Sequence, residues 1–323
     1  MRATFLLLTY NQQDYVSHAV RAALAQVGEP LQIFISDDAS TDNTFAVIQS
    51  TVMGYDGHHQ VTLNRNQHNL GIAGHINASM ERIKTDYVIA AAGDDISAPN
   101  RSQLILECFD QTTALLVHSR TQDIDTAGKL LKHRGGHNSA SFFHTTSAKQ
   151  LVKAMALYIG ATGAWHRELF DRFGDLPKGC YEDLVLGYRA SLLDRVAMID
   201  KALVQYRAGI GVSAEPSMPE NLADWRKLRL KELSHSKAVF EQRVLDNAIA
   251  HPDDHNFIAE ELRLGILSAA VRMSFHQSSF MSVLMRNVSS APFLLKELAS
   301  EWNRSRRAMR SISRTALLFA TEN

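Results

Sequence analysis

The sequence predicts an α/β protein whose first two-thirds form a mostly parallel sheet flanked by helices and whose last third is helical. Two observations support this prediction. Short apolar runs alternate with segments of helical spacing over the first part of the chain, which is typical of a parallel sheet. Beyond residue 215, apolar residues recur at helical spacing only, as in the series Ile258, Leu262, Ile266, Ala269 and Met273.

Four apolar runs are expected to form neighbouring strands, because each is followed by a turn or a helical pattern. They are residues 3–9, 31–36, 61–64 and 87–92. The helix after the second run is expected to begin at a cap supplied by Ser40 or Thr41. Further patterns predict strands at 115–118, 195–199 and 202–206, a turn at 125–128, a helix at 182–193 and a loop at 132–146.

The composition of the chain excludes several classes of protein. The 34 basic side chains balance the 34 acidic ones, so net charge gives no argument for a nucleic-acid partner. Cys108 and Cys180 are too few for a disulfide scaffold and indicate reduced thiols in a cytoplasmic protein. No segment has the apolar length expected of a membrane span, and neither a P-loop motif nor a hydrolase nucleophile motif is present.

Polar clusters stand at the ends of three predicted strands. They are Thr9-Tyr10-Asn11, Asp37-Asp38 and Asp94-Asp95. In open parallel sheets, ligands bind in the crevice outside the carboxyl ends of the strands. Three separate strands are therefore expected to direct polar groups into one crevice.

Four motifs occur in a fixed order along the chain. They are LTYN, ISDDASTDNT, NLGIAGHINASMERIKTDYVIAAAGDDISAPNR and YEDLVLGYR. Together they resemble glycosyltransferase family 2, over roughly residues 1–213, which implies the Rossmann-like GT-A fold. The resemblance implies a catalytic domain over residues 1–215, with a nucleotide-binding half at about 1–95 and an acceptor half at about 96–215. A helical C-terminal region, residues 216–323, follows it.

The resemblance implies a metal site at the AGDD segment. Asp94 matches the metal-ligating position, and Asp95 is a second ligand or a support, for a divalent Mn²⁺ or Mg²⁺ that neutralises a leaving diphosphate. The sequence departs from the family's pattern at Ala92, where an acid is usual. The alternative is that both acids only cap the helix after Pro99.

Nucleotide-binding roles fall on the strand ends by the same resemblance. Asp38 and Tyr10 are expected to hold the base, since a carboxylate accepts a ring N–H and an aromatic face stacks on a base. Thr9, Asn11, Gly71 and Asp94 complete the expected nucleotide site. The alternative for Asp38 is a turn with Ser40 that caps a helix.

The Glu182-Asp183 pair matches the family's acidic pair at a helix start. The resemblance implies that Asp183 is the general base, which takes the proton of the acceptor hydroxyl while the anomeric centre inverts. Helix amides are expected to keep Asp183 ionised. An acidic first turn that only stabilises the helix is the alternative. With Glu182, two more residues are expected near the acceptor or the diphosphate. They are Trp165 and Arg207. The alternatives are that Trp165 is a core residue and that Arg207 forms a surface salt bridge.

The function implied is transfer of a sugar from a nucleotide-sugar donor to a glycan or lipid-linked sugar hydroxyl, in bacterial surface polysaccharide synthesis. A non-catalytic nucleotide-sugar-binding scaffold and a nucleotidyltransferase are the alternatives. The basic and apolar residues after Trp302 predict either contact with a membrane surface or packing on protein, including a second copy. The expected location is the cytoplasm, free or at the inner face of the cell membrane.

Overall fold

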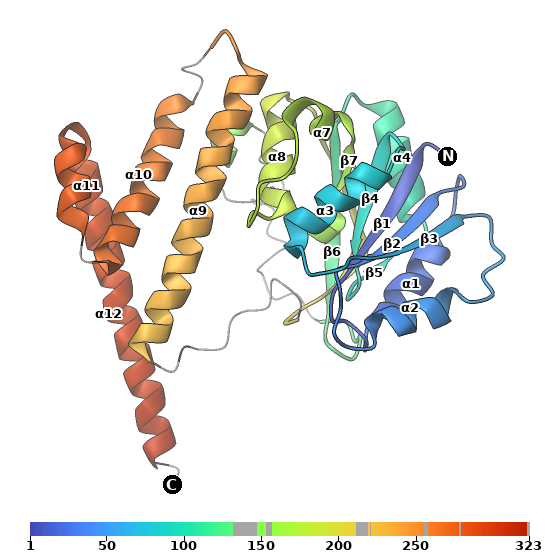
Figure 1. Ribbon diagram of the computed structural model, residues 1–323, viewed down its shortest axis with the longest axis horizontal. Coiled ribbons are helices and arrows are strands. Elements are labelled where there is room, and N and C mark those ends of the chain that lie inside the picture. Colours follow the sequence, from blue (N-terminus) through green and yellow to red (C-terminus); the bar gives the residue numbers. More distant parts are fainter. Residues whose placement is uncertain are drawn as a thin grey trace. The chain divides into compact units, whose positions relative to one another are not determined.

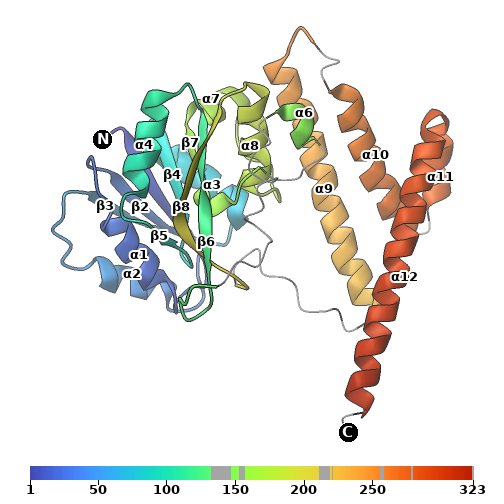
Figure 2. The same cartoon turned by 180° about the vertical axis from the view of Figure 1, so that it is seen from behind.

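The structure is a computed structural model, drawn as a ribbon in Figures 1 and 2. It describes residues 1–131, 147–152, 157–210, 219, 221–254, 258–277 and 279–321, with the backbone alone from 313 onward. The loop predicted at 132–146 lies outside these residues. The chain divides into two compact units, residues 1–214 with 246–252 and residues 215–245 with 253–323. The sequence pattern does not anticipate that residues 246–252 group with the first unit.

The first unit is built on a sheet in which eight strands are described, in the order β3-β2-β1-β4-β7-β6-β8-β5. Strands β1 to β4 run parallel, β7 is antiparallel to both of its neighbours, and β5 is antiparallel to β8. Their bounds are β1 Ala3–Thr9, β2 Gln32–Asp37, β3 Gln60–Arg65, β4 Tyr87–Ala92, β5 Ile96–Ser97, β6 Leu116–Ile124, β7 Ala164–His166 and β8 Val196–Arg207.

Helices cover both faces of this sheet. In Figure 1, α3 lies in front of the sheet, and in the reversed view of Figure 2, α4 lies in front. Alternate residues of β1 and β2, such as Phe5, Leu7 and Ile33, are buried against α1 and α4. The helices of the first unit are α1 Val16–Leu24, α2 Thr44–Val52, α3 Gly71–Arg82, α4 Arg101–Gln111, α6 Ala148–Leu151, α7 Glu168–Phe173 and α8 Glu182–Leu192.

Most predicted elements of the first unit are present, with three corrections. The strands predicted at 195–199 and 202–206 are one strand, β8, which runs beside β6 with register shifts at Arg120. Strands β5 and β7 are not predicted, because two or three residues carry no readable period. Helix α2 follows Asn43 rather than Ser40 or Thr41, and the carboxylate of Asp42 accepts the amide of Thr44 at 2.9 Å.

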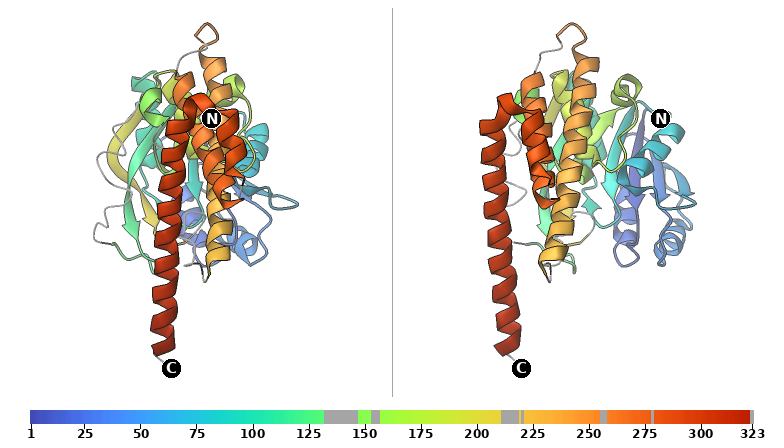
Figure 3. Two further views of the ribbon diagram at one scale, coloured as in Figure 1. Left: turned by 90° about the vertical axis from the view of Figure 1, so that its left-hand side faces the viewer. Right: turned by 60° about the vertical axis from the view of Figure 1, so that its left-hand side comes forward.

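The second unit contains the long helices α9 Leu222–Ala250, α10 Ala259–His276 and α12 Ala291–Thr321, with the short α11 Phe280–Arg286 between the last two. Figure 3 shows α12, in red, as one uninterrupted helix from two further directions. The buried carboxylate of Glu301 on α12 accepts both Nε and Nη2 of Arg229, at 2.8 and 2.9 Å, and lies 3.0 Å from Nε2 of His276. No described helix is long and apolar enough to cross a membrane.

A buried ion pair within the first unit joins Arg189 on α8 to Asp246, near the end of α9. Arg189 on α8 is fully buried, and its Nε lies 3.2 Å from each carboxylate oxygen of Asp246. The same guanidinium donates to the carbonyl oxygens of Phe173, Gly174 and Asp175. A buried guanidinium is tolerated only when its charge and its N–H groups are satisfied in this way.

We expect Asp246→Ala to lower the free energy of unfolding by about 3–5 kcal/mol, because Arg189 would remain buried without its counter-charge. Urea denaturation measures this change. The control on the same helix is Glu241→Ala, which removes an exposed partner of Lys237 and should cost at most about 0.5 kcal/mol. Equal effects of the two substitutions would show that the Arg189–Asp246 pair does not hold residues 246–252 in place.

Candidate functional site

The predicted polar clusters meet at one edge of the sheet because the parallel strands are in register. Thr9 pairs with Asp37, and Asp37 pairs with Arg65. The next strand is aligned with them, since Leu8 pairs with Ala92 and its carbonyl accepts the amide of Gly93 at 3.0 Å. The carboxyl ends of β1, β2, β3 and β4 therefore lie side by side.

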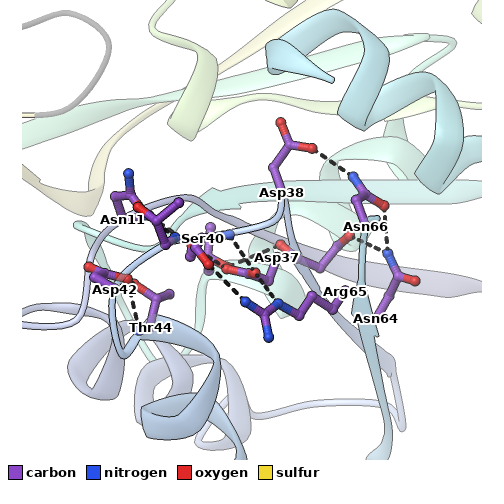
Figure 4. Close-up of polar contacts among 12 residues, drawn as sticks. Asn11, Asp37, Asp38, Ser40, Asp42, Thr44, Asn64, Arg65 and Asn66 are labelled. Carbon is purple, nitrogen blue, oxygen red and sulfur yellow. Dashed lines mark hydrogen bonds and ion pairs between the residues drawn. The ribbon is translucent and has the colours of Figure 1, made fainter. Parts of the chain in front are cut away.

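Asp37 organises the turn that follows β2 (Figure 4). It is fully buried, and its carboxylate accepts the hydroxyl of Ser40 at 2.5 Å and the amide of Ser40 at 2.9 Å. Arg65 crosses from β3, with Nε 3.5 Å from Asp37 and Nη2 donating to the carbonyl oxygen of Ser40. Asp37 and Ser40 therefore shape this turn rather than cap helix α2.

Asp38 is committed to the start of helix α3. Its buried carboxylate accepts the side-chain amide of Asn66 at 2.7 Å and the backbone amides of Leu70 at 3.0 Å and Gly71 at 3.0 Å. Figure 4 shows the Asp38–Asn66 contact between the ends of β2 and β3. These bonds use most of the accepting capacity of a carboxylate. The predicted turn of Asp38 with Ser40 is not formed, because Ser40 bonds to Asp37 and Asp38 instead accepts amides at the start of α3, a helix that begins 33 residues later in the chain.

Tyr10 is the exposed aromatic residue at this edge. Its side chain is 43% exposed at the end of β1, where Asn11 adopts a φ of 51°. Asn11 is held by its amide, which donates to Ser40 Oγ at 2.9 Å, and by its Oδ1, which accepts the amide of Thr41. A fixed backbone with a free ring suits stacking on a flat ligand. Gly71, with a φ of +70°, begins α3 at the same edge.

Asp94 and Asp95 lie in the turn after β4 and are both buried. The side chain of Gln12 hydrogen-bonds Asp94, and Asp95 Oδ1 accepts the amide of Arg207 at 2.8 Å. Burial raises the pKa of Asp94, and burial together with the charge of Asp94 raises the pKa of Asp95 to about 8. Neither acid caps α4, which follows Asn100, so the capping alternative for this pair is wrong.

Gly93 allows Gln12 to approach this turn. A Cβ at residue 93 would lie 2.4 Å from Oε1 of Gln12 and 2.8 Å from Cγ2 of Thr9. Gln12 therefore bridges the end of β1 and the acidic turn, and its Oε1 also accepts the amide of Tyr10 at 3.2 Å. The sequence analysis missed Gln12, because a single glutamine after a strand carries no signal of its own.

Arg207 is a structural support of the acidic turn rather than a surface salt bridge. It is buried, and its Nε donates to the carbonyl of Asp94 at 2.9 Å while Nη1 donates to the carbonyls of Asp125 and Thr126. Its guanidinium also lies over the ring of Tyr15, 4.7 Å from the centroid. These contacts leave little of the side chain to reach a diphosphate.

The acidic turn fits a divalent cation only if other ligands complete the shell. Among the described residues, no three His, Cys, Asp or Glu side chains gather closely enough to hold a metal. Asp94 and Asp95 are adjacent buried acids with raised pKa values, so a cation would relieve their mutual repulsion. Mg²⁺ and Mn²⁺ accept one or two carboxylates together with phosphate oxygens and water, so a diphosphate would supply the missing ligands.

The second acidic pair stands at the start of α8. Asp183 accepts backbone amides of its own helix and of Gly160, whereas its Oδ1 has no hydrogen-bond partner within the described part of the chain. Burial and the neighbouring Glu182 raise the pKa of Asp183 well above its usual range. Desolvation thus outweighs the helix amides, which lower the pKa of Asp183 by less than burial raises it. The outcome is a stronger base.

Tight packing holds this second pair in place. A Cβ at Gly160 would lie 1.9 Å from Oε1 of Glu182, so only glycine fits there. The buried hydroxyl of Tyr158, a residue that the sequence analysis missed, has no described partner, and burial and both carboxylates raise its pKa. Gly163, three residues after Gly160, is tied to β4, since its carbonyl accepts the amide of Ala90 at 3.0 Å.

Arg101 joins the two acidic regions. It is fully buried, and its Nη2 donates to the carbonyl of Ala90 at 2.7 Å and more weakly to that of Gly163 at 3.4 Å. Its Nη1 donates to Ser97 Oγ at 2.9 Å. Burial lowers the pKa of Arg101 to about 9. The guanidinium thus connects the strand before Asp94 to the segment that donates to Asp183.

Trp165 is a core residue. It lies in β7, pairs with Val88 and Leu116 on either side, is 0% exposed and packs beside Phe170 with ring centroids 6.2 Å apart. A fully buried ring offers no face to a sugar, so the core alternative describes Trp165.

Comparisons with known proteins identify the family. The model of glycosyl transferase family 2 matches residues 4–174, more than half of the chain. The chain belongs to glycosyl transferase family 2. The chain is 30% identical to chondroitin synthase of Escherichia coli over 147 residues, which cover 45% of the chain and 20% of that protein. The chain spans about half the length, or less, of the first curated relatives that it matches.

Solved structures show that this chain has the GT-A fold. S. aureus TarS, residues 1–349 in complex with UDP-GlcNAc, matches with a TM-score of 0.57 at 14% identity, over 96% of this chain and 92% of that one. The mannosyltransferase PcManGT of Pyrobaculum calidifontis, in complex with GDP-Man and Mn²⁺, matches with a TM-score of 0.54 at 16% identity, over 98% and 87%. The predicted fold is confirmed.

We expect Asp38→Ala to lower the free energy of unfolding by about 1–3 kcal/mol, because it leaves the side chain of Asn66 and two backbone amides without an acceptor. Urea denaturation measures the loss, and Asp86→Ala, at an exposed residue of the same unit, should change stability by no more than about 0.5 kcal/mol. Normal stability with lost nucleotide affinity would instead assign Asp38 to direct contact with the base.

We expect Asp183→Asn to stabilise the protein more at pH 8 than at pH 5. The pKa of Asp183 is raised on folding, so ionisation of this group reduces stability progressively as pH rises above its unfolded value near 4. Asparagine has no such ionisation. Thermal unfolding at the two pH values measures the difference, with Asp175→Asn, at an exposed residue just before α8, as the control. An equal shift at both pH values would mean that Asp183 is well solvated.

Proposed function

We propose that this chain is a metal-dependent inverting glycosyltransferase that moves a sugar from a nucleotide-sugar donor to a hydroxyl of a glycan or lipid-linked sugar. The observation that carries the proposal is the pairing of two acidic sites on one framework. Asp94 lies at the carboxyl edge of the parallel strands, and one carboxylate oxygen of Asp183 has no partner among the described residues. Arg101 connects the segments that hold them.

The donor side of the proposal rests on the strand ends. Tyr10 would stack on the base, Thr9, Asn11 and Gly71 would border the nucleotide, and Asp38 would act by holding the start of α3. A divalent ion at Asp94, supported by Asp95, would neutralise the charge of the leaving diphosphate. The two solved structures in complex with nucleotide sugars support a donor of this class.

The acceptor side rests on Asp183. Its Oδ1, which no described residue contacts by a hydrogen bond, would take the proton of the acceptor hydroxyl. The acceptor oxygen would bond to the anomeric carbon as the bond to the diphosphate breaks on the opposite face. Burial raises the pKa of Asp183 toward neutral pH, and a base with a higher pKa takes a proton more readily. The neighbouring charge of Glu182 would make Asp183 a stronger base. Neither Trp165 nor Arg207 is assigned a contact with substrate.

The biological setting proposed is the synthesis of a bacterial polysaccharide. Its support is the likeness to a bacterial chondroitin synthase. A non-catalytic scaffold that binds nucleotide sugars is the second candidate, because Ala92 departs from the acidic pattern that the family resemblance implies. A scaffold has no use for a carboxylate with a raised pKa and an oxygen that no described residue contacts, so Asp183 favours the enzyme.

We expect Asp94→Asn and Asp183→Asn to separate donor binding from transfer. Asp94→Asn should weaken the Mn²⁺-dependent affinity for the best of UDP, dTDP and GDP, measured by calorimetry with Mn²⁺ and then with chelator. Asp183→Asn should leave that affinity intact and lower the rate of transfer by roughly 10²–10⁴-fold, the usual contribution of a positioned base. Asp175→Asn is the matched control for both measurements.

Each outcome assigns a role. Equal nucleotide affinity with Mn²⁺ and with chelator would remove the metal from the proposal. Near-normal transfer by Asp183→Asn would show that another group is the base, with Glu182 the first candidate. Tight nucleotide-sugar binding by the wild-type chain, without transfer to any glycan or lipid-linked sugar, would favour the scaffold.

A further inference from the structure

The second unit presents a line of exposed apolar side chains on helix α12. Leu295, Trp302 and Met309 are 55%, 49% and 41% exposed. They are spaced by seven residues, close to two turns of an α-helix, so they lie along one side of α12 over about 21 Å. Large apolar side chains in a line on a surface indicate an interaction site more often than single ones do.

Exposed cationic side chains accompany this line. Arg306, Arg307 and Arg310 are exposed on the same stretch of α12, together with Lys296 and Arg304. We call Leu295, Trp302 and Met309 with Arg306, Arg307 and Arg310 the α12 surface. The guanidinium of Arg306 lies over the ring of Trp302, 4.6 Å from its centroid, so the two kinds of side chain interleave.

The acidic residues of the same stretch are turned inward. Glu301 is fully buried and paired with Arg229 and His276. Glu297 is 14% exposed and paired with Arg272 at 2.6 Å. Between residues 291 and 312 the helix has no other carboxylate. Contacts inside the second unit therefore neutralise both carboxylates of this stretch, whereas its described basic side chains stay exposed.

We propose that the α12 surface lies on an anionic membrane surface. A helix with apolar and aromatic side chains on one side and arginine beside them is the kind that lies in the plane of the lipid headgroups. Tryptophan favours that boundary, because its ring is apolar and its N–H reaches water. Phospholipid phosphates would supply the negative charge for Arg306, Arg307 and Arg310, which form no ion pair with any described residue.

A second copy of the chain fits this surface less well. Pairing two α12 surfaces would bring the arginines of both copies together without an exposed carboxylate to neutralise them, and like charges at an interface oppose association. An anionic glycan would match the arginines but not Leu295 and Met309, which offer no hydrogen bonds to hydroxyl groups. A lipid headgroup layer accommodates both the apolar side chains and the arginines of the α12 surface.

The test is flotation of the full chain with vesicles of phosphatidylcholine alone or with added phosphatidylglycerol. Wild-type protein should float with the anionic vesicles only, and less at high salt, since salt screens the attraction. Arg306→Glu, Arg307→Glu and Arg310→Glu together should reduce partitioning by at least about 100-fold, because each basic residue near an anionic membrane contributes about 1 kcal/mol. The control, Arg226→Glu, Lys227→Glu and Lys231→Glu, reverses three exposed charges on α9 and should float like wild type.

Fluorescence supplies a second readout that needs no charge reversal. Anionic vesicles should shift the tryptophan emission of the wild-type chain to shorter wavelength, and Trp302→Phe should lose that shift while keeping its circular dichroism. The proposal is overturned if wild type does not float, if the α9 control loses flotation as fully as the α12 variant, or if the protein is a dimer that the α12 reversal dissociates. None of these measurements depends on glycosyl transfer, so their failure is distinct from a failure of the proposed function.

Discussion

The parallel register of β2, β1 and β4 is the constraint on which the rest of the site depends. Backbone hydrogen bonds fix Thr9 beside Asp37 and Leu8 beside Ala92, so the three strands end at one line. The polar groups of the edge end a strand, as Thr9 and Asp37 do, or follow one closely, as Asp38 and Asp94 do. A slip of one residue would turn the strand residues to the other face. The buried apolar faces of these strands oppose such a slip.

This edge treats its carboxylates in two ways. Asp37 and Asp38 are buried but saturated with hydrogen bonds, so they shape the turn after β2 and the start of α3. Burial raises the pKa of Asp94 and of Asp183 despite the donors that each of them meets. The first kind is a structural element of the fold. In the second kind, burial destabilises the charged form, and a bound cation or proton would relieve that destabilisation. Carboxylates of this kind are common at functional sites.

In the second unit, too, buried contacts determine which charged side chains stay exposed. Its buried network of Arg229, His276 and Glu301 stabilises the helices from within. That network and the Arg272–Glu297 pair use the carboxylates of α12, whereas Arg306, Arg307 and Arg310 are exposed. The fold of this unit therefore generates a basic, partly apolar surface from a chain whose acidic and basic residues are equal in number.

The sequence by itself determined the strands at 3–9 and 87–92, the order of the elements and the strand-end position of the polar clusters. These features depend on local period and on turn residues, which a linear pattern records. The tertiary structure alone decided that Asp38 holds α3, that Arg207 supports the acidic turn, that Trp165 is core and that Gly160 donates to Asp183. Each of those outcomes joins residues more than 20 positions apart through strand register and packing, and neither period nor spacing encodes which distant donor a buried carboxylate will meet.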